Sequence, residues 1–236
     1  MKKTGTLFLI PVPLAPEVPE ASFTPYLSET INQINEYIVE NEKTARRFLK
    51  EAGLKTPQSS LILHDYSKHK RERSSMKPFF RGLLEGRDAG LMSEAGCPGV
   101  ADPGSDVIAH AHSLGIKVSP LVGPSSIMLG LMASGFNGQS FAFHGYLPID
   151  KEPRAKRLAQ LEQEAVRNKQ TQIFIETPFR NNRMLETILK TVSDRRMLCV
   201  AVNLTGKDEL IISDTIQNWK TKTVDFHKMP AIFLLF

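Results

Sequence analysis

The chain has 236 residues, 41% of them hydrophobic, and its 30 Lys and Arg against 25 Asp and Glu give a net charge of +5. This is the composition of a folded globular protein, and it excludes a mainly disordered or fibrous architecture. Two cysteines are too few for a disulfide-stapled secreted domain, so we expect a cytoplasmic protein.

The sequence predicts neither an export signal nor a membrane span. The apolar run at 7–10 is interrupted by Pro11 and Pro13, and the apolar residues at 230–236 are too few to cross a bilayer. The sequence pI of about 9.2 is compatible with an RNA partner, although a charge of +5 is a mild bias. We therefore expect no membrane attachment, and RNA stays open as a partner.

Short β-rich runs alternate with segments of helical period, which predicts an α/β fold built on mostly parallel strands. The pattern starts with a strand at 6–10 and an amphipathic segment at 28–39. The helical spacing of that segment rests on four apolar residues: Ile31, Ile34, Tyr37 and Ile38. A helix at 42–50 follows, with Asn41 as its N-cap and Gly53 at its end.

Strands come next at 61–63 and 89–92, separated by a helix that begins in the basic stretch 68–73. A loop at 93–104 leads to another helix, for which Asp102 is the expected N-cap and Pro103 the first residue. The chain then continues with a strand at 116–120, a helix at 127–133 and a strand at 141–143.

Two prolines in a polar setting, Pro148 and Pro153, interrupt this alternation and predict a linker. We therefore expect an N-terminal domain at 1–145 and a C-terminal domain at 146–236. The second domain is expected to contain helices at 154–168, from 177 onward and at 216–219, and strands at 171–176, 196–202, 210–213 and 231–236.

Four small or proline-rich loops follow predicted strands, at the end where open α/β sheets bind ligands. They are 11–13, 93–104, 123–126 and 176–178. The 93–104 loop exceeds the ~2–6 residues that a strand-to-helix turn needs, which points to a ligand. It matches neither a Walker phosphate-binding loop nor Gly-x-Gly-x-x-Gly, so nucleotide triphosphate hydrolysis and ordinary dinucleotide binding lose support.

The order and spacing of these motifs resemble the tetrapyrrole methylase family over nearly the whole chain. The motifs that carry the resemblance are 5–13, 93–104, 122–126, 145–148 and 175–180. Within the family, the chain resembles the branch that methylates a ribose 2′-oxygen of a cytidine in small-subunit ribosomal RNA. The resemblance implies an S-adenosylmethionine-dependent methyltransferase that forms a homodimer. It also implies a mostly parallel sheet in the N-terminal domain, a mixed sheet in the C-terminal domain and the cofactor in the cleft between them.

Carried over by position, the resemblance implies these cofactor-binding residues: Pro11, Glu94, Val100, Ser125, Ser126, Ile127, Asn203 and Pro230. Pro11 and the backbone around Glu94 would flank the cofactor, with Val100 nearby. Residues 125–127 would hold its ribose or methionine end. The second domain, around Asn203 and Pro230, would cover its adenine.

Three positions depart from the ribosomal RNA branch: Ala15-Pro16 replaces Gly-Asn, Asn41-Glu42 replaces Asp-Thr and Val202-Asn203 replaces Arg-Glu. Each lies where a nucleic acid could be held, so methyl transfer is better supported than the ribosomal substrate. A small-molecule acceptor such as a tetrapyrrole, and a non-catalytic cofactor- or RNA-binding role, stay open as alternatives.

Methyl transfer to a hydroxyl needs a base that takes its proton, and carboxylates at strand ends are the candidates. They are Glu40, Glu42, Glu94 and Glu176, which the sequence alone does not rank. Arg180 can pair with Glu176 or with a substrate phosphate, a structural ion pair being the plainer alternative. We take Glu40, Glu176 and Arg180 as the candidate catalytic residues.

Other reactive side chains have plainer explanations. His64, Asp65 and His69 lack a second group of ligands at metal-binding spacing, so we expect no metal. Cys97 has no identifiable histidine partner and is expected to be a small loop residue rather than a nucleophile. The basic stretch 68–73 can track an RNA backbone or can simply be a solvated helix face.

Overall fold

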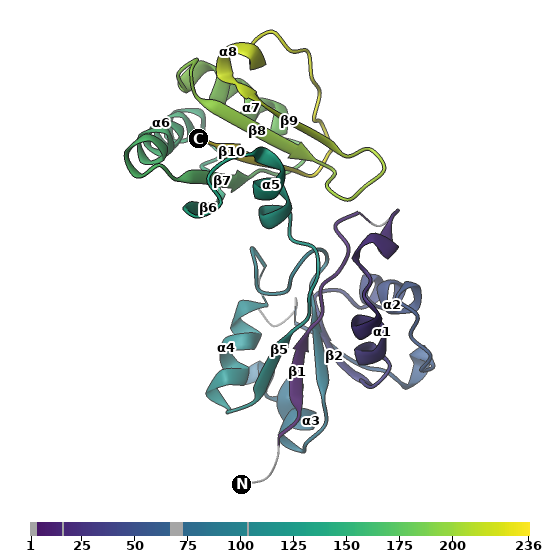
Figure 1. The fold of residues 1–236 in the computed structure, drawn as a ribbon. Coiled ribbons are helices and arrows are strands. Elements are labelled where there is room, and N and C mark those ends of the chain that lie inside the picture. The colour runs from purple at the N-terminus through teal and green to yellow at the C-terminus, as the bar shows by residue number, and fades with distance from the viewer. Residues whose placement is uncertain (1–3, 16, 67–72, 103) are drawn as a thin grey trace. The chain divides into compact units, whose positions relative to one another are not determined.

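The computed structural model describes residues 4–15, 17–66, 73–102 and 104–236. The chain forms two compact units, Met1–Ser125 and Ser126–Phe236, and each has a sheet and a core of its own (Figure 1). This division falls before the boundary expected at 145–146. The reason is that β6 (Phe141–Tyr146) pairs with β7 (Thr171–Ile175), so 147–150 is a connection inside the second unit.

The first unit contains a five-stranded parallel sheet in the order β3-β2-β4-β1-β5. The strands are β1 (Thr6–Leu9), β2 (Glu36–Val39), β3 (Ile62–Asp65), β4 (Ala89–Met92) and β5 (Lys117–Pro120). Because all five are parallel, their carboxyl ends meet at one edge, which we call the first carboxyl edge. The loops after β1, β4 and β5 all leave the sheet there.

Helices cover both faces of this sheet. On one face, α1 (Pro25–Ile31) and α2 (Glu42–Glu51) bury Leu27, Phe48 and Leu49 against β2. On the other face, α3 (Arg81–Leu84) and α4 (Ser105–Ser113) bury Leu83 and Val107. Short 3₁₀ segments complete the unit: η1 (Pro19–Ser22), η2 (Gln58–Ser60) and η4 (Arg73–Phe80).

Two local predictions in the first unit are wrong. Tyr37 and Ile38, expected on an amphipathic helical segment, lie in β2, which is buried on both faces and so lacks the alternation of a half-buried strand. Asp102 does not cap α4, whose N-cap is Gly104. Asp102 Oδ1 instead accepts from the backbone N–H of Gly104 at 2.7 Å. Pro103 and the basic residues 68–72 lie outside the described residues.

The second unit contains a mixed sheet in the order β6-β7-β10-β8-β9. Strands β6 and β7 are parallel, and the other neighbouring pairs are antiparallel. The remaining strands are β8 (Met197–Val202), β9 (Leu210–Thr215) and β10 (Ala231–Leu235). The expected α/β fold, with one mostly parallel and one mixed sheet, is confirmed.

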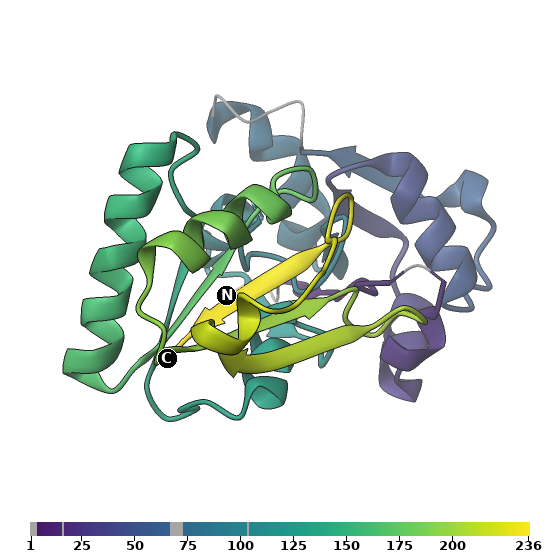
Figure 2. The same ribbon diagram turned by 90° about the horizontal axis from the view of Figure 1, so that it is seen from above.

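Helices α6 (Lys151–Asn168), α7 (Asn181–Thr191) and α8 (Ile216–Trp219) pack on one face of this sheet around Phe174 and Phe233 (Figure 2). On the other face lies α5 (Ser126–Ser134), where a Cβ on Gly130 would be 3.0 Å from Ile232 Cγ2. Within the part of the chain that the structure describes, no helix combines the length and apolar character needed to cross a membrane.

Candidate functional site

Three loops are tied together at the first carboxyl edge. Val12 N–H donates to Gly96 O at 2.9 Å, and Gly96 N–H donates back to Val12 O at 2.8 Å. A Cβ on Gly123 would be 2.1 Å from Pro11 Cβ, so only glycine lets the loop after β5 lie against the Pro11 ring. The loops after β1, β4 and β5 therefore form one continuous surface, which includes the predicted residues Pro11 and Glu94.

Cys97 belongs to this surface through its side chain. Its Sγ lies 3.3 Å from Pro124 O, and burial raises the pKa of the thiol. A thiol with a raised pKa stays protonated at neutral pH and is a poor nucleophile. The geometry thus supports a packing role for Cys97.

Acidic groups gather at the carboxyl ends of β2, β3 and β4. The Thr44 hydroxyl donates to Glu94 Oε1, and the Tyr66 hydroxyl lies 3.4 Å from Asp102 Oδ1. The pKa of Tyr66 is far above its usual value, first because of burial and then because of the charges of Asp102, Glu40 and Glu94. The Tyr66 phenol is therefore neutral at physiological pH, and the carboxylates of Asp102, Glu40 and Glu94 all act on it.

Strand pairing brings three predicted residues to one edge of the second sheet. Ala231 pairs with Val202, and Ile232 pairs with Ile175. Glu176 directly follows β7, Asn203 directly follows β8 and Pro230 directly precedes β10, so all three lie on the same side of the sheet. Asn203 N–H donates to Pro230 O at 3.0 Å, and Asn203 adopts a left-handed conformation with φ of 48°. We call this side of the sheet the second edge.

Glu176 and Arg180 form a close ion pair at the second edge. The Glu176 side chain has no exposed area, and its Oε1 accepts from Arg180 Nη2 at 2.6 Å, from Arg180 Nε at 3.0 Å and from Thr177 N–H at 2.6 Å. Hydrogen bonding to Glu176 raises the pKa of Arg180, so the guanidinium stays charged. Glu176 Oε2 is buried and has no hydrogen-bond partner among the described residues.

Asn181 is a buried residue of this edge that sequence reasoning missed. Its Nδ2 donates to Met229 O at 2.6 Å, which ties the start of α7 to the loop before β10. Its Oδ1, like Glu176 Oε2, is buried without a hydrogen-bond partner in the described part of the chain. Its position right after Arg180 was the available signal, but nothing in the local pattern indicates a contact with Met229.

The remaining predicted residues make fewer described contacts at the two edges. Val100 is 49% exposed in the loop after β4. Ser125 ends the first unit, while Ser126 and Ile127 open α5 in the second, where the Ile127 side chain is buried. Glu42 is exposed on α2 and lies 3.8 Å from Arg46, so its carboxylate is engaged along the helix.

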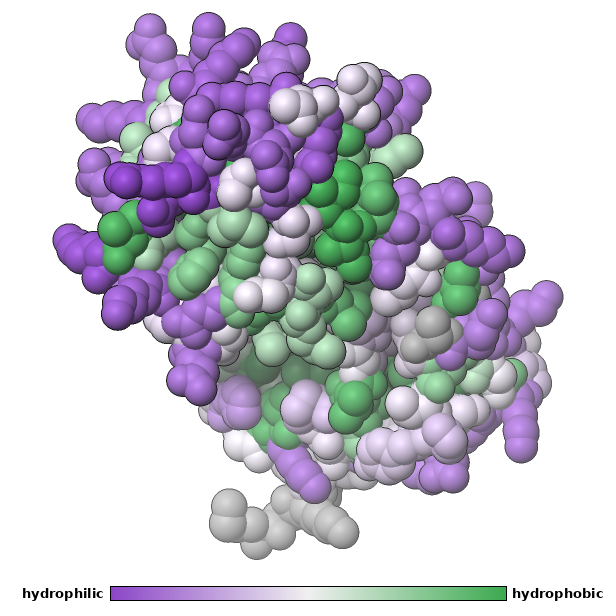
Figure 3. All heavy atoms as spheres, turned by 45° about the horizontal axis from the view of Figure 1, so that its top comes forward, coloured by the Kyte–Doolittle hydropathy of each residue, from purple (hydrophilic) through white to green (hydrophobic). Residues whose placement is uncertain are grey.

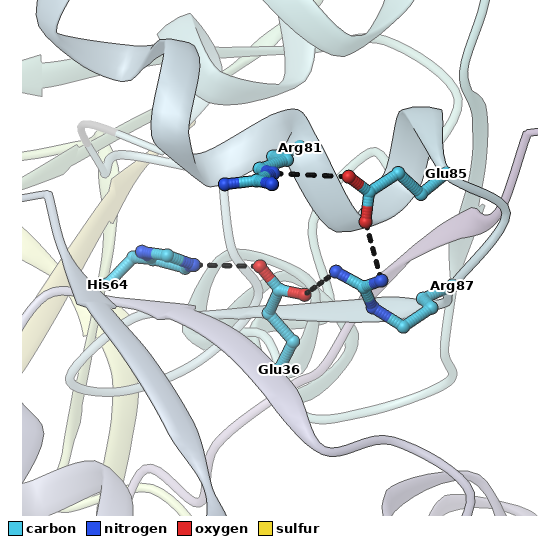
Figure 4. A network of polar contacts seen from close by, with 5 residues as sticks. All are labelled: Glu36, His64, Arg81, Glu85 and Arg87. Carbon is cyan, nitrogen blue, oxygen red and sulfur yellow. Dashed lines mark hydrogen bonds and ion pairs between the residues drawn. The ribbon is translucent and has the colours of Figure 1, made fainter.

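His64 takes part in a separate network of the first unit (Figure 4). Its Nε2 lies 2.8 Å from Oε1 of the nearly buried Glu36, whose Oε2 is 3.8 Å from Arg87 Nη2. Arg87 and Arg81 both pair with Glu85. Glu36 begins β2, so this network is remote from the first carboxyl edge and has a structural role. Across the described residues, no group of three or more His, Cys, Asp or Glu is arranged to hold a metal ion.

Among known proteins, three relatives of this chain carry the same name. No protein-family model matches the chain. Ribosomal RNA small subunit methyltransferase I of Synechocystis is 29% identical over 90% of this chain and 72% of that protein. The Bacillus subtilis protein of the same name is 29% identical over 90% of this chain and 68% of its own length. The Buchnera aphidicola protein is 28% identical over 100% of this chain and 79% of its own length.

A solved structure shares the fold. The crystal structure of the methyltransferase CobJ superimposes with a TM-score of 0.60 and 19% identity, over 99% of this chain and 93% of that one. The fold, the sequence relatives and the order of the loop motifs agree with one another. The chain is thus a homologue of ribosomal RNA small subunit methyltransferase I by sequence and shares the fold of the methyltransferase CobJ.

Proposed function

We propose that the chain is an S-adenosylmethionine-dependent methyltransferase that modifies a ribose 2′-oxygen in ribosomal RNA, and that it works in the cytoplasm. The observation that carries the proposal is its similarity to ribosomal RNA small subunit methyltransferase I over 90% of the chain or more in three relatives.

The residues present fit the cofactor. The carboxylates of Glu40, Glu94 and Asp102, which all act on Tyr66, suit the positive charge of a sulfonium group. At the second edge, the unpartnered buried oxygens of Glu176 and Asn181 suit the hydrogen-bond donors of an adenosine. Both edges therefore offer groups that a ligand of this chemistry would satisfy.

The cofactor-binding residues follow from this fit and from the family resemblance. Pro11, Val100 and the backbone at Glu94 flank the cofactor in the first unit. Residues 125–127 hold its ribose or methionine end, and Asn203 and Pro230 cover its adenine. Most of these contacts are made by backbone, which agrees with the glycine-dependent approach of the loop after β5 to Pro11.

When bound, S-adenosylmethionine supplies an electrophilic methyl group, so the chain has only to align the acceptor, exclude water and accept one proton. Glu176 already accepts three hydrogen bonds on Oε1, two of them from Arg180, so we assign it to positioning Arg180. Arg180, whose side chain is 29% exposed, is available to a phosphate of the acceptor. Glu40, at the end of β2, is the proposed base for the 2′-hydroxyl proton.

A homodimer is part of the proposal. Met128 and Met132 lie one turn apart on α5 and are 47% and 75% exposed. Figure 3 shows hydrophobic side chains reaching the surface among hydrophilic ones. Exposed apolar helix faces commonly mark protein interfaces. Analytical ultracentrifugation should give a dimer that Met132→Glu weakens, and a monomeric wild type would contradict the dimer.

Calorimetric titration with S-adenosylmethionine and its demethylated product tests the cofactor. We expect micromolar binding that is lost in Ser126→Trp, which fills the start of α5. The matched control is Ser113→Trp at the exposed last residue of α4, which should bind normally. No binding by the folded wild-type chain would favour the non-catalytic alternative.

Transfer of a labelled methyl group to undermodified small ribosomal subunits tests the acceptor. We expect label at a ribose 2′-oxygen, and little label with Glu40→Gln. Label on an added tetrapyrrole but not on RNA would instead support the small-molecule alternative.

A further inference from the structure

A pocket of about 130 Å³ lies in the first unit at the first carboxyl edge. It is enclosed by the loop after β1, one side of α2 and the loop after β4. Val12, Leu14 and Phe48 supply apolar wall, while Arg47 and Glu94 supply opposite charges. The contacts described above assign no role to Arg47 or to the apolar wall of this pocket.

The size of the pocket limits its occupant. A cavity of ~150 Å³ in another protein holds a benzene molecule, so about 130 Å³ accommodates one six-membered ring. The volume matches a single ring more closely than the two fused rings of a purine. This argues against the adenine of the cofactor and in favour of a pyrimidine base.

The polar groups distinguish between pyrimidines. Glu94 Oε1 accepts from Thr44, and no described residue donates to Glu94 Oε2. Arg47 is exposed and forms no ion pair or hydrogen bond with another described residue. At the exocyclic position on C4, cytosine presents an amine and uracil a carbonyl, so a carboxylate that faces this position accepts from cytosine and is repelled by uracil. A carboxylate accepts from the cytosine amine, and a guanidinium donates to acceptors.

The geometry points to this pocket as the site for the base of the acceptor nucleotide, with Glu94 and Arg47 selecting cytosine. The inference rests on the proposed function. It agrees with the position of Glu40, since Glu40 directly precedes Asn41, the N-cap of the helix that lines the pocket. A ribose attached to a base in the pocket thus remains at the edge that carries the proposed base for its proton. Glu51 adds a second carboxylate to the rim.

Methyl transfer by wild type, Arg47→Gln and Glu94→Gln tests the inference, with undermodified small ribosomal subunits as the acceptor. The control is Lys50→Gln, which removes the same charge from an exposed position of α2 that does not line the pocket. We expect kcat/KM for the subunits to fall about tenfold to hundredfold in both pocket variants, the size of one base-selective contact. The affinity of Arg47→Gln for S-adenosylmethionine, measured by calorimetry, should not change, and Lys50→Gln should match wild type in both measurements.

A change of selectivity provides a second readout. A glutamine amide can donate to the uracil carbonyl, so Glu94→Gln should methylate subunits whose target cytidine is replaced by uridine better than wild type does.

The outcomes separate the two proposals. If wild type transfers methyl groups and the pocket variants do so equally well, the pocket assignment is wrong and the proposed function stands. Loss of cofactor affinity in Arg47→Gln would assign the pocket to the cofactor instead. Absence of transfer by wild type would overturn the proposed function and the pocket assignment with it.

Discussion

At the scale of single residues, Gly99 and Gly115 share a left-handed backbone but differ in surroundings. Gly99, in the loop after β4, has φ of 80°, and a Cβ there would be 2.6 Å from Ile108 Cδ1. Gly115 has φ of 68° and nothing within 4 Å of such a Cβ. We expect Gly115→Ala to lower the free energy of unfolding by ~1 kcal/mol from backbone strain alone. Gly99→Ala should cost ~1–3 kcal/mol more because of the clash. If urea unfolding gives equal losses of unfolding free energy for the two variants, the loop around Gly99 rearranges to accommodate the added Cβ.

The ion pair of Glu176 and Arg180, which precedes α7, should be coupled more strongly than an exposed pair on α7. Glu176 has no exposed side-chain area, whereas Glu186 and Lys190 are 4.0 Å apart, with 67% and 73% of their side chains exposed. A double-mutant cycle with Glu176→Gln and Arg180→Met should give a coupling above the ~0.3–0.5 kcal/mol typical of an exposed pair. The cycle at Glu186 and Lys190 is the control. Similar couplings in both cycles would contradict the positioning role of Glu176.

Tyr37 and Tyr66 predict how stability depends on alkaline pH. Burial raises the pKa of both phenols well above the usual ~10. Their contribution to stability is therefore constant below pH ~10 and is lost as the pH rises further, because only the unfolded state releases these protons. Each group should contribute up to ~1.4 kcal/mol per pH unit in that window. Urea unfolding between pH ~9 and ~11 should show a shallower fall for Tyr66→Phe, and an unchanged slope would contradict the raised pKa.

At the scale of elements, capping and hydrophobic periodicity predicted the bounds of helices and strands best where no contact distant in sequence alters their ends. The strand Ala89–Met92 and the helix Ile216–Trp219 begin and end where the sequence predicts. The helix expected from Thr177 begins only at Asn181, after a turn in which Arg180 N–H donates to Thr177 O at 2.9 Å.

For the candidate site, the sequence predicted which loops take part but not the contacts between residues far apart in the chain. Motif order indicated the loops that meet at each edge, and strand pairing does bring Glu176, Asn203 and Pro230 to one side. The contacts of Tyr66 with Asp102 and of Asn181 with Met229 join residues far apart in the sequence. Such contacts arise only when the sheets form, so no local pattern encodes them.

The start of α2 allows a direct test of one capping prediction. Asn41 Oδ1 accepts from Lys43 N–H at 2.9 Å, as its predicted N-cap role requires. Asn41→Ala should lower the free energy of unfolding by ~1 kcal/mol, whereas Asn41→Asp keeps the acceptor and should change it little. Because α2 lines the pocket next to Glu94, we also expect Asn41→Ala to weaken methyl transfer. Equal stability of the two variants would show that the cap is not made in solution.

At the scale of the whole molecule, the two units offer separate reporters. Trp219 is the single tryptophan of the chain and is 1% exposed in the core of the second unit, where its Nε1 donates to Leu198 O at 2.8 Å. Cys97 is partly exposed in the first unit. Trp219 fluorescence therefore follows unfolding of one unit, and thiol labelling of Cys97 follows opening of the other.

Ligand linkage turns these reporters into a test of whether both units hold the cofactor. A ligand that binds only the folded state, at a free concentration of about one hundred times its Kd, raises the free energy of unfolding by ~2.7 kcal/mol. If Pro11 in the first unit and Pro230 in the second both contact S-adenosylmethionine, it should slow Cys97 labelling and also raise the denaturation midpoint seen by Trp219. Protection of Cys97 with an unchanged Trp219 midpoint would restrict the cofactor to the loops of the first unit. In that case the adenine-binding role proposed for Asn203 and Pro230 would be wrong, and the buried oxygens of Glu176 and Asn181 would need another ligand.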